Sequence, residues 1–189
     1  MSDSISIAAF AGSLRAKSVN RGLLRAAVEV APADATIRIL ALHDLPFYDA
    51  DHDGPASPPA VIAFRNAIAA ADALLIATPE YNYSVSGVLK NAIDWASRKP
   101  SQDTPPALQG KPAAIMGAGG RFGTVRAQAH LRYILLHNDV KLVNKPEVMI
   151  PRAWEYFDGD GNLTDEAMRD QVRDLVVALV AWTRLLRKA

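Results

Sequence analysis

Short apolar runs alternate with segments of helical spacing along the chain. Buried strands are predicted at four apolar runs, 5–11, 37–42, 73–78 and 113–117. A fifth strand region is predicted across 140–143 and 148–150, with an interruption at Pro146. Apolar residues at helical spacing predict five helices, over 18–30, 58–71, 87–98, 124–137 and from 165 onward. Ser57 is expected to cap the second helix and Thr164 the last.

Strands that alternate with helices predict an α/β fold, a parallel sheet covered by helices on both faces. Five strands in a short chain favour a flavodoxin-like three-layer sandwich with the strand order 2-1-3-4-5. In that order strands 1 and 3 are neighbours, and the helices after them lie on opposite faces. The loops that follow therefore diverge and leave a crevice, which is where such sheets bind ligands. The loops after strands 1, 3 and 4 are the most unusual stretches of the chain, 12–20, 79–86 and 117–123.

Composition narrows the class of protein. A chain of 189 residues predicts one domain, 1–189, with a substantial core. The formal net charge of +1 offers no basic field for nucleic acid. No cysteine is present, which excludes disulfides, thiolate nucleophiles and cysteine metal sites. No signal peptide or membrane-spanning run is visible, so no membrane insertion and a cytoplasmic location are expected.

The first loop, GSLRAKSVN, opens a helix and carries groups that suit a phosphate. A helix N-terminus presents unpaired N–H groups and a partial positive charge. Ser13, Ser18 and Asn20 add donors, and Arg15 adds a positive charge. The loop matches neither a P-loop nor the three-glycine dinucleotide motif. An ordinary capped helix with a surface arginine is the alternative.

The second and third loops suggest a flat polar ligand. Two tyrosines, an asparagine and Pro79 crowd the second, where rings and backbone amides can cover a heterocycle. A nucleophile elbow is excluded because Ser84 stands where glycine is needed. The glycines of GAGGRFG allow backbone to approach a ligand edge, or else form a loose turn.

No metal site is expected. Asp158 begins a calcium-like loop, but Leu163 stands where glycine is required and Arg169 where glutamate is required. The acidic segment around Asp51 is read as a solvated loop in preference to a site for a hard metal.

Four stretches resemble the NAD(P)H-dependent FMN reductases of flavodoxin-like fold, which include bacterial quinone and chromate reductases and some azoreductases. They are GSLRAKSVN, PEYNYSVSGVLKNAIDWASR, LQGKPAAIMGAGG and PRAWEYFDGDGNLTDE. The second is the most specific, although the family usually has proline where this chain has Ser86, which is expected to loosen the following helix start slightly.

The resemblance assigns three groups of residues to FMN. Ser13, Arg15, Ser18 and Asn20 would hold the phosphate. The isoalloxazine and ribityl chain would be bordered by Pro79, Glu80, Tyr81, Asn82 and Tyr83. Three glycines would approach the other edge of the ring, Gly117, Gly119 and Gly120. The resemblance also implies a homodimer or homotetramer, which sequence patterning does not show.

The implied reaction is hydride transfer from NADPH or NADH to FMN at N5, followed by reduction of a small acceptor such as a quinone. The protein supplies orientation and a restricted cavity, so no catalytic residue is named and ping-pong kinetics are expected. The alternatives are a flavodoxin-type electron carrier, a regulatory protein that has lost FMN, and a reductase of free flavin. Such carriers usually have a strongly acidic surface, which this nearly neutral chain lacks. The natural acceptor and the preference for NADPH or NADH stay open.

Overall fold

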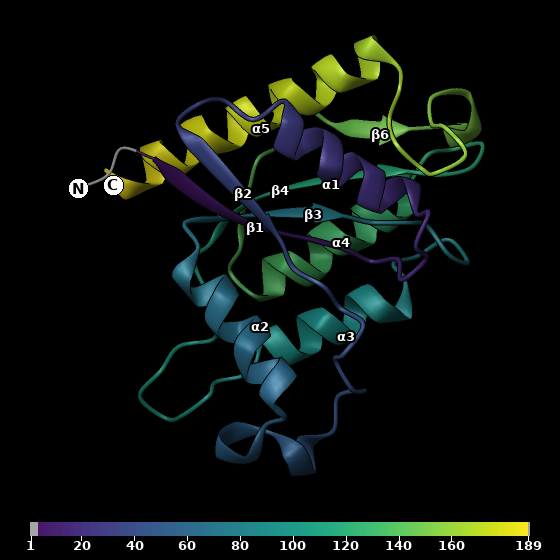
Figure 1. Ribbon diagram of the computed structural model, residues 1–189. Helices are drawn as coiled ribbons and strands as arrows, with labels where there is room; N and C mark the ends of the chain where they lie inside the picture. Colours follow the sequence, from purple (N-terminus) through teal and green to yellow (C-terminus); the bar gives the residue numbers. More distant parts are fainter. Residues whose placement is uncertain (1–3, 189) are drawn as a thin grey trace.

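A parallel sheet forms the centre of the protein, as a computed structural model of residues 4–188 describes it (Figure 1). β1 (Ile5–Ala11) lies between β2 (Ala35–Ile39) and β3 (Ala73–Ala77), and β4 (Pro112–Ala118) follows on the far side of β3. The strand order β2-β1-β3-β4-β5 confirms the predicted topology. The carboxyl ends of β1, β3 and β4 therefore meet at one edge of the sheet.

The sheet has six strands where five were predicted. β5 (Lys141–Leu142) pairs with the beginning of β4, and β6 (Val148–Ile150) pairs with its end. The predicted fifth strand region is thus divided into two pieces on the same side of β4. Pro146 lies in the gap, where its missing N–H prevents it from donating to a ladder.

Helices cover both faces of the sheet (Figure 1). One face carries α1 (Val19–Glu29) and α5 (Glu166–Arg187). The opposite face carries α2 (Pro59–Ala70), α3 (Gly87–Ala96) and α4 (Val125–His137). Successive side chains of β1 point to opposite faces of the sheet and so pack against both helix layers. Ile7 and Ala9 pack toward α1 and α5, while Phe10 packs toward α2 and α3. Short 3-10 turns lie at Ala50–His52, Gly54–Ala56 and Ala153–Glu155. Within residues 4–188, no helix combines the length and apolar character needed to cross a membrane.

Two predicted capping residues, Ser57 and Thr164, are wrong by one position. α2 begins at Pro59, and the Ser57 hydroxyl accepts a hydrogen bond from Arg65 Nη1 in place of a capping bond. α5 is capped by Asp165, whose carboxylate accepts from the Met168 N–H at 2.9 Å. The Thr164 hydroxyl donates instead to the Tyr156 carbonyl, a partner that is not visible from local sequence.

A buried arginine anchors the long segment between β2 and α2. Arg65 is only 4% exposed, and its Nη2 donates to Asp53 Oδ1 at 2.7 Å. Its Nε donates to the Trp95 carbonyl at 2.7 Å, so the segment is joined to both α2 and α3. Asp53 is therefore part of an internal ion pair.

Candidate functional site

The first and second loops are joined directly where β1 ends. The Gly12 N–H donates to the Ala77 carbonyl at 2.9 Å, and Ser86 Oγ donates to the Gly12 carbonyl at 2.6 Å. A Cβ at position 12 would lie 2.8 Å from both Leu89 Cβ and Ser86 Oγ, so this close approach requires glycine. Ser86 also caps α3 by accepting from the Leu89 N–H, a hydrogen bond that proline at this position could not make.

Asn20 joins the first loop to the third. Its Nδ2 donates to the Ala118 carbonyl at 2.9 Å, and its Oδ1 accepts from the Ala118 N–H at 3.0 Å. The side chain is 2% exposed. The three predicted loops therefore meet at the end of the sheet, although the side-chain amide of Asn20 is occupied within the protein.

The first loop retains open groups that suit an anion. Ser18 caps α1 by accepting from the Arg21 N–H at 3.4 Å. The Ser13 hydroxyl has no hydrogen-bond partner within residues 4–188. Arg15 Nη2 donates to the Lys17 carbonyl at 3.5 Å, and the guanidinium forms no ion pair with any carboxylate of residues 4–188. The positive end of α1, a hydroxyl and a guanidinium thus surround one turn.

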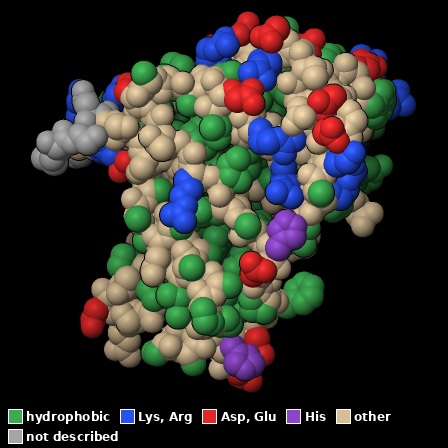
Figure 2. All heavy atoms as spheres, in the orientation of Figure 1, with side chains coloured by type: hydrophobic (Ala, Val, Ile, Leu, Met, Phe, Trp, Pro, Cys, Tyr) green, Lys and Arg blue, Asp and Glu red, His purple; other side chains and the backbone are tan. Residues whose placement is uncertain are grey.

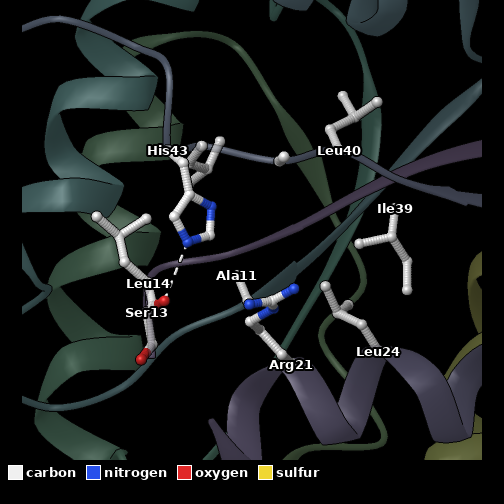
Figure 3. Close-up of a pocket in the computed structure, with 10 residues that line it drawn as sticks. Ala11, Ser13, Leu14, Arg21, Leu24, Ile39, Leu40 and His43 are labelled. Atoms are coloured by element: carbon white, nitrogen blue, oxygen red, sulfur yellow. Dashed lines mark hydrogen bonds between the residues drawn. The ribbon is translucent and has the colours of Figure 1, made fainter. Parts of the chain in front are cut away.

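A cavity of about 160 Å³ lies beside this loop, on the β2 side of β1 (Figure 3). Leu24, Ile39 and Leu40 give it an apolar wall, and the nitrogen-bearing side chains of Arg21 and His43 line it. His43 Nε2 lies 3.0 Å from the Leu14 carbonyl, which joins the segment after β2 to the loop.

Arg21 and His43 are absent from the residues predicted by sequence. Arg21 could have been found because it stands on the first turn of α1, one residue beyond Asn20. His43 carries no comparable signal, since only the packing of the segment after β2 brings it to the loop. In Figure 2, Lys and Arg side chains gather over the beginning of α1.

The second loop contains a tight turn. The Tyr81 N–H and carbonyl exchange two 3.0 Å hydrogen bonds with Ser84. Asn82 and Tyr83 between them have φ angles of 51° and 65°, as a two-residue type I′ turn requires. Tyr81 and Tyr83 are exposed while Pro79 is buried, so the rings lie at the surface, available to a flat ligand.

The Glu80 side chain reaches from this turn to the beginning of α4. Its Oε2 accepts from the Arg126 and Ala127 N–H groups, at 2.9 and 3.2 Å. Its Oε1 accepts from Arg126 Nη1 at 2.9 Å. The carboxylate therefore holds the beginning of α4.

The glycines of the third loop serve different purposes. A Cβ at Gly117 would lie 2.1 Å from Thr124 Oγ1, and one at Gly119 would lie 2.7 Å from the Gly123 carbonyl. Both glycines are thus required by packing within the protein. Gly120 is exposed, with open space at its Cβ position. Across residues 4–188, no three His, Asp or Glu side chains gather as metal ligands would.

Comparison with known proteins gives a consistent result. The family model described as NADPH-dependent FMN reductase matches residues 5–155. An NAD(P)H-dependent FMN reductase of Pseudomonas aeruginosa is 50% identical over 188 residues, covering 99% of this chain and all of that protein. An NAD(P)H:quinone oxidoreductase of Solanum tuberosum is 45% identical, covering 97% of this chain and 95% of its own. The solved structure of FerB, a flavoenzyme NAD(P)H:(acceptor) oxidoreductase of Paracoccus denitrificans, matches with a TM-score of 0.81 and 34% identity, over 95% of this chain and 97% of that one.

Proposed function

The chain belongs to the NADPH-dependent FMN reductase family, and from this premise we propose that it reduces quinones or similar small acceptors with NADPH or NADH. Membership makes it an oxidoreductase that uses FMN and NAD(P)H. When bound, FMN supplies the redox chemistry by taking a hydride from NAD(P)H and passing two electrons to the acceptor. The observation that supports this site is the meeting of three loops at the neighbouring ends of β1, β3 and β4.

We assign the FMN phosphate to the first loop. The Ser13 hydroxyl and the Arg15 guanidinium would donate hydrogen bonds to it. Ser18, as the cap of α1, would hold the N-terminus of this helix beside the phosphate. Asn20 would take part through its backbone N–H, because Ala118 occupies its side chain. Arg21 adds a second positive charge from the adjoining cavity. This donor set fits a phosphate without requiring any carboxylate to be neutralised.

We assign the ring and ribityl chain to the second and third loops. Tyr81, Asn82 and Tyr83 present surfaces that a planar group can contact, and Gly120 leaves room at the opposite loop. Glu80, Gly117, Gly119 and the buried Pro79 would contribute by holding these loops in place. None of these residues needs to act as an acid or base, so their part is to bind, orient and restrict access to water.

A visible spectrum of the purified protein tests the proposal. The absorbance of oxidised flavin at about 450 nm should disappear when NADPH is added without oxygen, and return when excess benzoquinone is added. A yellow protein that NADPH does not reduce would favour a flavodoxin-type electron carrier. A colourless protein that binds no added FMN would contradict the proposal, whereas weak but measurable FMN binding would identify a reductase of free flavin.

We further propose that the protein self-associates as a dimer or tetramer. Large apolar side chains are exposed on α4 and α5, including Tyr133 at 80%, Leu136 at 71% and Leu185 at 59%. Exposed apolar groups of this kind are enriched where proteins associate. Light scattering coupled to gel filtration measures the mass of the protein in solution. A mass equal to one chain at micromolar concentration would contradict self-association. The cytoplasmic location stays a prediction.

A further inference from the structure

The N-terminus of α4 takes its cap from the second loop. Thr124 stands at the capping position and makes no side-chain capping bond. Glu80 of the second loop accepts instead from the Arg126 and Ala127 N–H groups. A carboxylate at this position satisfies N–H groups that a helix start leaves without partners and complements the helix dipole. The cap of α4 therefore joins two loops of the predicted ligand site.

Arg126 extends the same junction to the third loop. Its guanidinium carbon lies 4.2 Å from the centre of the Tyr83 ring and 4.7 Å from that of Phe122. The ion pair with Glu80, at 2.9 Å, fixes the guanidinium between the two rings. Tyr83 and Phe122 remain 66% and 53% exposed, so the stack ends in open aromatic surface.

The turn held by this junction is conformationally demanding. Asn82 and Tyr83 both have positive φ angles, which a bulky residue such as tyrosine seldom adopts. Such a conformation persists only where surrounding contacts impose it. The Ser84 hydroxyl supplies one more contact with α4, lying 2.9 Å from His130 Nδ1.

We propose that Glu80 is a positioning residue that fixes the 79–86 turn and the loop before α4 in the arrangement that receives FMN. It acts through Arg126 and the α4 cap, and its carboxylate contacts neither FMN nor the acceptor. The inference rests on the proposed function, because it assigns these loops to FMN. It predicts that loss of the Glu80 contacts weakens cofactor binding beyond any loss of general stability.

Equilibrium binding of FMN to apoprotein, followed by quenching of flavin fluorescence, tests this. Glu80→Ala should weaken FMN binding roughly ten-fold or more, because the turn loses its imposed conformation. Asp165→Ala is the matched control, since its carboxylate also caps a helix, α5, through the Met168 N–H. It should lower the melting temperature comparably and leave the FMN dissociation constant unchanged. Glu80→Gln, which keeps an acceptor for the helix but loses the ion pair, should bind with intermediate affinity.

A double-mutant cycle separates the junction from independent effects. Arg126→Gln should weaken FMN binding, and the Glu80→Gln/Arg126→Gln pair should lose less than the product of the single effects, because both remove one interaction. The inference would be overturned if the double variant lost FMN affinity by the full product of the two single effects. It would also be overturned if Glu80→Ala bound FMN as tightly as the unaltered protein. If Glu80→Ala does not fold, the two glutamine variants carry the test. If the unaltered protein binds no FMN, the proposed function itself is wrong.

Discussion

The side chain of Asn20 and the backbone of Ala118 form a reciprocal pair of hydrogen bonds, 2.9 and 3.0 Å long, across 98 residues of sequence. The carboxamide thus binds both the N–H and the carbonyl of the last residue of β4, as the backbone of a neighbouring strand would. It thereby holds the first turn of α1 against the third loop. Because both groups are buried, the pair satisfies polar atoms that water does not reach.

Replacement of Asn20 by alanine is expected to lower the free energy of unfolding by about 2–3 kcal/mol, because a buried N–H and a buried carbonyl lose their partner. Urea denaturation of the apoprotein measures this change without any cofactor. An unchanged stability together with a large loss of FMN affinity would show that the side chain binds phosphate directly, as the family resemblance implies.

Arg15 and Arg21 are expected to differ in their importance for FMN. Arg15→Ala should weaken FMN binding by about ten- to a hundred-fold, since it removes a charge-assisted bond to the phosphate. Arg21→Ala should weaken it by only about three-fold, because Arg21 adds charge from the adjoining cavity. Riboflavin, which has no phosphate, should bind all variants alike. Arg38→Ala, on the exposed side of β2, serves as the control, and equal losses for FMN and riboflavin would refute the phosphate assignment.

Periodicity alone predicts most of this fold, because strands of a covered parallel sheet are continuous apolar runs and helices repeat every three to four residues. β1 begins and ends where its apolar run does. Strand order then identifies the three loops that meet. Periodicity cannot reveal side-chain partners far along the chain, such as Ala118 for Asn20 and Arg126 for Glu80. It also cannot separate Thr164 from Asp165 as a cap, since both residue types suit that position.

Gly22 is expected to tolerate no side chain. A Cβ there would lie 1.8 Å from the Gly161 carbonyl, where the 158–163 turn packs on α1. Gly22→Ala should therefore cost about 2–3 kcal/mol of stability, although alanine favours helices. Gly87→Ala is the matched control at another helix start, with open space at the Cβ position, and should be neutral or slightly stabilising. Equal stabilities for the two variants, measured by thermal unfolding, would contradict the close packing of this turn.

The Asp53–Arg65 pair is expected to make stability depend on acid pH. Burial alone would raise the pKa of Asp53, but hydrogen bonds from Arg65 and the Gly54 N–H outweigh burial and hold the pKa below its ordinary value. An acid with a lowered pKa in the folded state contributes its full stability above the unfolded pKa, about 3.9. That contribution is lost as the pH falls through the folded value.

Asp53→Asn should therefore cost about 2 kcal/mol at pH 7, where the charged hydrogen bond is complete, and progressively less on acidification below about pH 4. Urea midpoints measured from pH 7 to strongly acid pH give the difference between the two proteins directly. Asp51→Asn is the control, because Asp51 forms no ion pair within residues 4–188. A stability difference for Asp53→Asn that stays constant down to the lowest pH would mean that the carboxylate of Asp53 is not stabilised by Arg65. The anchoring of the 43–58 segment would then come from hydrogen bonds whose partners do not titrate in this range. They include the Arg65 bonds to Ser57 and Trp95 and the bond from Trp95 Nε1 to the Pro46 carbonyl.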